Sequence, residues 1–117
     1  MTKNFKVIRE TRGDVALFKL QGYLNDLGGE EVERLFQEEV GRGFKKFILD
    51  FSRVAYINSI GVSFLLGILE TTRDGDLMLC FTALSKINEE LFDMVGLKKY
   101  AFVFPTNEEA CAYLNGR

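Results

Sequence analysis

Short apolar or β-branched runs alternate with segments of helical length along this 117-residue chain, and this alternation restricts its fold more than any other feature. The runs that predict strands span residues 5–10, 14–20, 44–51, 77–81 and 100–104. Gly13 and Asp14 form the expected turn of a hairpin between the first two. The order β-β-α-β-α-β-α-β-α predicts a mixed, mostly parallel sheet with an N-terminal hairpin and about four helices. The expected fold class is therefore α/β, with residues 1–117 in one domain.

Each expected helix has a polar residue that can cap its N-terminus. The candidates are Asn25 or Asp26 for the first helix, Asn58 or Ser59 for the second, Ser85 for the third and Thr106 for the last. In the third helix, Ile87, Leu91 and Val95 recur at helical spacing and predict its apolar face. Gly96 can end that helix.

The chain has no histidine. This excludes Ser-His-Asp and Cys-His catalysis, histidine general bases and histidine-ligated zinc, so we expect neither an enzyme nor a metal or cofactor site. A net charge of -2 gives no general attraction to nucleic acid or anionic lipid. Cys80 and Cys111 lack metal-type spacing, and we expect them to be reduced thiols of a cytoplasmic protein.

Residues 58–69, NSIGVSFLLGIL, are the least polar stretch of the chain, and they are too short to cross a membrane. In a helix that begins at Ser59, the face suited to packing on the sheet comprises Gly61, Val62, Leu65, Ile68, Leu69 and Thr72. The opposite face comprises Ile60, Ser63, Phe64 and Gly67. It lacks the charges of an ordinary surface helix, which predicts either a docking surface for a partner or contact with a neighbouring helix.

Ser59 also has two interpretations. Serine and asparagine are both preferred N-caps, and the cap role is the favoured interpretation of Ser59 taken alone. If Asn58 is the cap instead, the Ser59 hydroxyl lies exposed beside N–H groups that stabilise anions. A phosphate there would add about two negative charges next to a partner bound over Ile60 and Ser63, and could act as a binding switch.

The segment LDFSRVAYINSIGVSFLL resembles the signature of STAS domains, the family of bacterial anti-sigma-factor antagonists, in which a strand ending in Asp-x-Ser precedes Asp-Ser-x-Gly and a leucine-rich helix. The corresponding residues are Asp50, Ser52, Val54, Ile57, Asn58, Ser59, Gly61, Leu65 and Leu66. LQGYLND resembles the family's Gly-x-Leu-Asp loop, and residues 84–114 resemble its C-terminal half. The resemblance covers nearly the whole chain and implies a STAS-like fold.

The resemblance also implies a protein-binding regulator. In such antagonists the serine at the position of Ser59 is phosphorylated by an anti-sigma factor that is an ATP-dependent serine kinase, and a PP2C-type phosphatase reverses the change. The unphosphorylated form holds the kinase and frees the sigma factor. The expected partner-binding residues are Asn25, Asp26, Asn58, Ser59, Ile60, Ser63, Phe64 and Gly67.

Two other functions compete with this one. Asn58 replaces the family's usual Asp and removes a charge that could help recruit a kinase, which favours a non-phosphorylated scaffold subunit of a stress-signalling or lipid-transport complex. A nucleotide-binding protein or enzyme could use Asp26 and Asp50 on either side of a pocket near Ser59. The chain, however, has neither a Gly-x-x-x-x-Gly-Lys-Ser/Thr loop nor a Gly-x-Gly-x-x-Gly loop.

Overall fold

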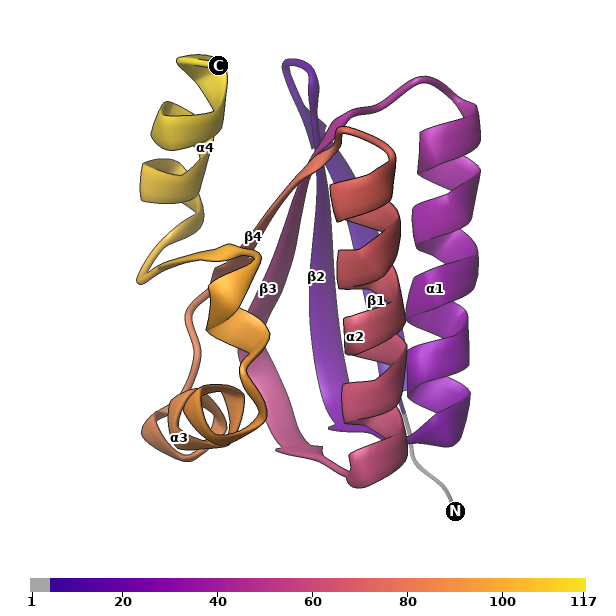
Figure 1. The fold of residues 1–117 in the computed structure, drawn as a ribbon, viewed down its shortest axis with the longest axis vertical. Coiled ribbons are helices and arrows are strands. Elements are labelled where there is room, and N and C mark those ends of the chain that lie inside the picture. The colour runs from indigo at the N-terminus through magenta and orange to yellow at the C-terminus, as the bar shows by residue number, and fades with distance from the viewer. Residues whose placement is uncertain (1–4) are drawn as a thin grey trace.

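A computed structural model describes residues 5–117, which form a five-stranded sheet with helices on both faces (Figure 1). The strands are β1 (Phe5–Arg12), β2 (Val15–Leu24), β3 (Lys46–Ile57), β4 (Met78–Thr82) and β5 (Phe102–Phe104). The α-helices are α1 (Asp26–Gly41), α2 (Ser59–Asp74), α3 (Lys86–Val95) and α4 (Asn107–Asn115), with a 3-10 turn η1 at Leu97–Lys99.

The sheet has the mixed topology that the element order predicts. Its strands lie in the order β1-β2-β3-β4-β5, with β1 and β2 antiparallel and every other neighbouring pair parallel. Gly13 turns the hairpin with a positive φ of 63°, a conformation that glycine adopts without strain. The predicted α/β fold class is confirmed.

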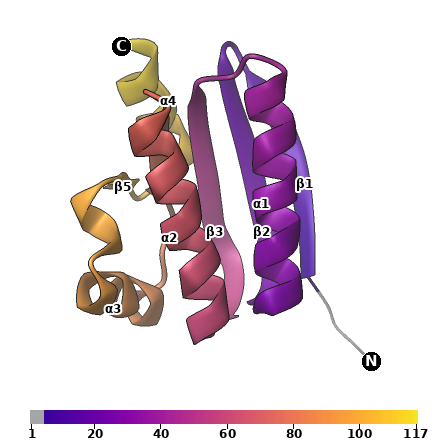
Figure 2. The ribbon, with the colours of Figure 1, turned by 45° about the vertical axis from the view of Figure 1, so that its right-hand side comes forward.

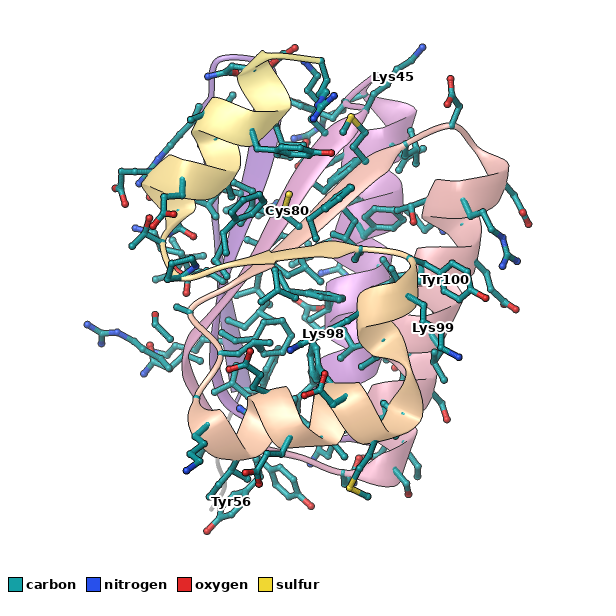
Figure 3. All side chains as sticks on the ribbon, turned by 60° about the vertical axis from the view of Figure 1, so that its left-hand side comes forward. Lys45, Tyr56, Cys80, Lys98, Lys99 and Tyr100 are labelled. Atoms are coloured by element: carbon teal, nitrogen blue, oxygen red, sulfur yellow. The ribbon has the colours of Figure 1, made fainter. Side chains whose placement is uncertain are left out.

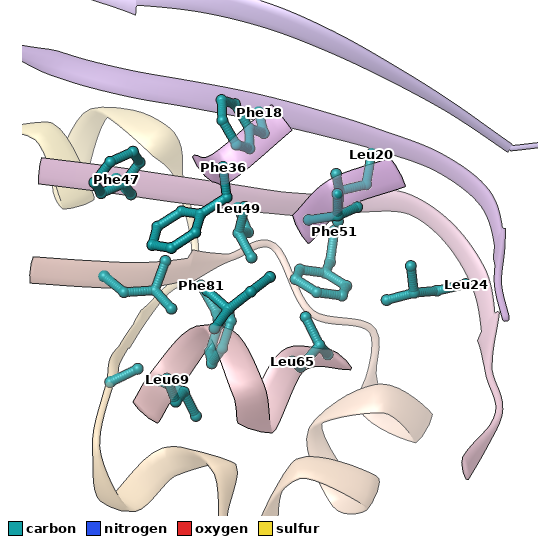
Figure 4. Packing of buried hydrophobic residues seen from close by; sticks show 14 of the residues in the cluster. Phe18, Leu20, Leu24, Phe36, Phe47, Leu49, Phe51, Leu65, Leu69 and Phe81 are labelled. Carbon is teal, nitrogen blue, oxygen red and sulfur yellow. The ribbon is translucent and has the colours of Figure 1, made fainter. Parts of the chain in front are cut away.

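Alternate residues of the central strands supply two apolar layers, as the period of a strand requires. On β2, Phe18 and Leu20 face the layer under α1 and α2, whereas Leu17 faces α4. The larger layer contains most of the buried phenylalanines (Figure 4). Phe51, Phe81 and Phe92 pack there edge to face, with ring centroids 5.0 to 5.7 Å apart.

The smaller layer contains Cys80 of β4, whose side chain packs with Ala110 and Leu114 of α4. Burial raises the pKa of the Cys80 thiol to about 12, because the thiolate would lose its hydration. Cys80 is therefore a core residue and a poor nucleophile at neutral pH. Both Cys80 and Cys111 are free thiols.

The strand predicted at residues 44–51 extends further than expected, because β3 continues to Ile57. Within β3, β4 pairs with Lys46–Asp50 alone, so among residues 5–117 the rest of β3 has β2 as its only neighbouring strand. α3 lies beside this extension, where the Asn88 side-chain amide donates a hydrogen bond of 3.3 Å to the Val54 carbonyl. That buried amide replaces a ladder bond that β4 does not provide.

The prediction for the apolar face of α3 is wrong. Asn88 and Phe92 are the buried residues of this helix, whereas Ile87 is 76% exposed and Val95 is also exposed. The helix is rotated because Asn88 reaches the Val54 carbonyl and Phe92 enters the phenylalanine cluster. Its ends are as predicted, with Ser85 as the N-cap and Gly96 in the left-handed conformation.

Candidate functional site

The carboxyl ends of β2 and β3 lie side by side, and each is followed by an asparagine that caps a helix. Leu24 pairs with Ile57 in the sheet. Asn25 Oδ1 then accepts the Gly28 N–H at 3.0 Å, and Asn58 Oδ1 accepts the Gly61 N–H at 2.8 Å. The two bonds place the N-termini of α1 and α2 next to each other (Figure 2).

The two helix starts are a short local repeat. LNDLG at residues 24–28 and INSIG at residues 57–61 share an apolar residue, an asparagine cap, a polar first helical residue, an apolar second residue and a glycine. Asp26 and Ser59 occupy the same place in the two copies. The apolar residues that follow them are 73% exposed at Leu27 and 47% exposed at Ile60. The repeat is visible in the sequence, and it is the signal that indicates two adjoining caps.

Ser59 is the exposed first residue of α2, and its interpretation as the cap is wrong because Asn58 takes that role. The Ser59 carbonyl accepts the Ser63 hydroxyl at 3.1 Å. The Ser59 hydroxyl itself makes no hydrogen bond to any residue from 5 to 117. Its oxygen is therefore accessible and uncommitted.

The position of Ser59 is fixed by a close contact two residues further along the helix. A side chain at Gly61 would overlap the backbone carbonyl of Leu24, so only glycine permits this approach of α2 to the end of β2. The Asn58 N–H donates to the same carbonyl at 3.1 Å. The start of α2 is therefore attached to β2 on both sides of Ser59.

Two of the four residues on the second face of α2 contact α1, as one interpretation predicts; the other two are exposed, and docking of a partner on them stays a prediction. The Phe64 ring lies where a side chain at Gly29 of α1 would be, and Gly67 faces the Glu33 carboxylate of α1. Ile60 and Ser63 remain exposed. The six residues predicted to pack on the sheet are all buried.

Sequence reasoning missed several exposed apolar residues at this end of the molecule. The Tyr23 and Tyr56 rings pack edge to face, 5.8 Å apart, on the ends of β2 and β3. Tyr56 is exposed at the end of β3 (Figure 3), and α3 exposes Ile87 and Met94, seven residues apart on one face. Four exposed apolar residues lie at the ends of β2 and β3 and at the starts of α1 and α2, near Ser59: Tyr23, Tyr56, Leu27 and Ile60. We call them the carboxyl-end surface.

The nucleotide-site hypothesis placed Asp50 beside Asp26 and Ser59, but the structure places it elsewhere. Its buried carboxylate accepts the Ser52 N–H at 2.8 Å and the Asn107 amide at 2.9 Å. It lines a groove of about 470 Å³ on the α4 face of the sheet, and that groove includes neither Asp26 nor Ser59. The prediction that Asp26 and Asp50 lie on either side of one pocket near Ser59 is therefore wrong.

Residues 5–117 contain no cluster of three or more His, Cys, Asp or Glu side chains placed to ligate a metal ion. None of the helices in that range has the length and apolar character needed to span a bilayer.

The Asn58 cap makes a testable contribution to stability. Asn58→Ala removes the acceptor of the Gly61 N–H, and should lower the free energy of unfolding by about 1 kcal/mol in urea titrations without changing the slope. Asn25→Ala is the matched control and should cost a similar amount. Asn58→Asp should keep or slightly raise stability, since a carboxylate also suits a helix N-terminus. An Asn58→Ala protein as stable as the parent would contradict the assignment of the cap.

Two sequence comparisons identify the same family. The profile of the STAS domain matches residues 6–110. A candidate anti-sigma factor antagonist of Bordetella bronchiseptica, BtrV, is 30% identical over 95 residues, which are 80% of this chain and 80% of that protein.

Solved structures agree in fold. A candidate anti-sigma factor antagonist of Thermotoga maritima, TM1081, superposes with a TM-score of 0.86 at 18% identity, over 93% of this chain and 94% of that one. The anti-sigma factor antagonist SpoIIAA in its unphosphorylated form gives a TM-score of 0.75 at 20% identity, over 97% and 100%. Bacillus SpoIIAA in its phosphorylated form gives 0.72 at 21%, over 95% and 99%.

Proposed function

This chain belongs to the STAS domain family and is related to anti-sigma factor antagonists, and we propose that it binds an anti-sigma factor with serine kinase activity and is released when that kinase phosphorylates Ser59. The observation that carries the proposal is the exposed, uncommitted hydroxyl of Ser59 at the start of α2. The chain is then a kinase substrate in the cytoplasm and not an enzyme. A PP2C-type phosphatase restores binding, so that partner switching regulates transcription.

The chemical step needs only the serine from this chain. Ser59 Oγ attacks the γ-phosphorus of ATP held by the kinase, the bond to the β-phosphate oxygen breaks, and ADP leaves. The hydroxyl proton passes to a base of the kinase, because the described residues place no titratable side chain in hydrogen-bond contact with Ser59 Oγ. The product is phosphoserine with a charge of about -1.5 to -2.

The start of α2 can hold this charge without refolding. The Ser59 and Ile60 N–H groups have no acceptor among residues 5–117, and they point out of the positive end of the helix dipole. The Asn58 cap is neutral, so it satisfies the Gly61 N–H without repelling a neighbouring phosphate. The replacement of the family's usual Asp by Asn58 is therefore compatible with phosphorylation.

The carboxyl-end surface offers a partner apolar contact beside the serine. Ile60 and Leu27 are exposed on either helix start, and Tyr56 is exposed at the end of β3. A phosphate on Ser59 would have to be desolvated under any partner that covers Ile60, which costs binding free energy unless the partner supplies a cation. Release of the partner on phosphorylation follows from that cost.

Mass spectrometry after incubation with ATP and the kinase-type anti-sigma factor tests the modified residue. One phosphate should be added, and it should map to Ser59. Ser59→Ala should abolish the addition, whereas Ser63→Ala, one turn further along the exposed side of α2, should retain it. An unmodified parent protein, or a phosphate on Ser63, would contradict the proposal and favour the scaffold function.

Calorimetric titration of the same anti-sigma factor tests the switch. Ser59→Ala should bind as the parent does, while Ser59→Asp should bind at least about tenfold more weakly because the new charge is buried in the complex. Asn115→Asp adds the same charge at the exposed end of α4 and should leave affinity unchanged. Equal affinities for Ser59→Asp and Ser59→Ala would rule out the switch.

A further inference from the structure

β1 is a long, open edge of the sheet. It has eight residues and, among residues 5–117, pairs only with β2, whereas the opposite edge strand, β5, has three residues. Figure 2 shows β1 at the outer side of the sheet, beyond α1. Edge strands with unpaired backbone groups can add another strand, and proteins usually block them with proline, bulges or charged side chains that a second strand cannot match. β1 contains no proline, and its register with β2 is unbroken.

The backbone groups that face outward on β1 follow from the hairpin. Arg12 and Val15 flank its two-residue turn and form a hydrogen-bonded pair, so the even-numbered residues of β1 bond to β2. The N–H and C=O groups of Phe5, Val7, Arg9 and Thr11 therefore point away from the sheet. They have no backbone partner among residues 5–117.

The side chains of β1 divide between the two faces of the sheet. Phe5 and Val7 pack on the main core, and Arg9 bonds to carboxylates of α1. Lys6, Ile8 and Glu10 project from the other face, where Ile8 is 54% exposed. Along the strand, a cation and an anion therefore flank a central apolar residue at equal distances.

We propose that β1 pairs with β1 of a second copy of this chain, antiparallel and centred on Ile8. In that register Ile8 lies opposite Ile8 of the second copy, and Lys6 lies opposite Glu10 on both sides. Val7 and Arg9 face each other as hydrogen-bonded pairs, and so do Phe5 and Thr11. The result is a continuous ten-stranded sheet across a twofold axis.

Charge selects this register over its neighbours. Centring on Arg9 places Arg9 opposite itself and Lys6 opposite Arg12, and centring on Glu10 places two carboxylates together. Centring on Val7 leaves Lys6 opposite Ile8. Glu10 already contacts Lys19 and Arg12 at 2.9 Å, one through each oxygen, and its second pair of lone-pair sites can accept Lys6 of the second copy.

The pairing is weak and depends on concentration. One pair of edge strands buries much less surface than a stable dimer, which needs about 1,200 Å² or more. We expect a dissociation constant of about 0.1–1 mM for the dimer. The dimer is independent of Ser59, since the paired edge is formed by β1 alone.

Sedimentation equilibrium from about 10 μM to 1 mM tests the proposal. The average mass of the parent protein should rise from 13.3 kDa toward twice that value. Lys6→Glu should weaken self-association about tenfold, because a carboxylate at position 6 of each copy would then lie opposite Glu10 of the other copy. Lys99→Glu makes the same charge change at an exposed site away from β1 and should have no effect.

A mixture of two variants identifies the register. Lys6→Glu and Glu10→Lys proteins should each be poor self-associators, yet an equimolar mixture should dimerise nearly as the parent does, because both cross-strand pairs are again oppositely charged. Circular dichroism of each variant checks its fold. In the parent protein, amide signals of Val7 and Arg9 should shift with concentration while that of Lys99 stays constant. A parent that remains monomeric at 1 mM, or a mixture no better than its components, would overturn the proposal.

Discussion

The pairing of Leu24 with Ile57 is the contact on which the candidate functional site of this protein depends. It brings the ends of two parallel strands together, so the asparagine after each strand caps a helix at the same place. Gly61 then allows α2 to pack directly on the Leu24 carbonyl. Since Asn58 caps α2 through the Gly61 N–H, the Ser59 hydroxyl and the Ser59 and Ile60 N–H groups are left without a hydrogen-bond partner among residues 5–117. Asn58 thus caps the helix, and the adjacent Ser59 is the proposed site of modification.

Local spacing in the sequence was enough to predict most of the fold. The strand runs, the hairpin turn and the caps at Ser85 and Thr106 depend on a few neighbouring residues, and the structure contains each of them. Family resemblance identified the STAS fold through the segment around Ser59, and the domain profile agrees with it. Predictions of this kind succeed where residues close in the chain decide the conformation.

The errors occurred where residues far apart in the chain decide the outcome. Asn58 and Ser59 are both good caps, and the contacts of Asn58 and Gly61 with Leu24, more than thirty residues earlier, distinguish them. The face of α3 was misassigned because a polar residue, Asn88, is buried by a bond to Val54 on β3. The same rotation exposes Ile87. A periodicity of apolar residues contains no information about such a bond.

The start of α2 should accept a phosphate on Ser59, with about two negative charges, without a change of fold. Amide ¹H–¹⁵N spectra and urea unfolding of the protein phosphorylated on Ser59 test it most directly. We expect shifts confined to the first turns of α1 and α2 and to the ends of β2 and β3, with an unfolding midpoint equal to or above that of the unmodified protein. Shifts throughout the sheet, or a lower midpoint, would contradict it.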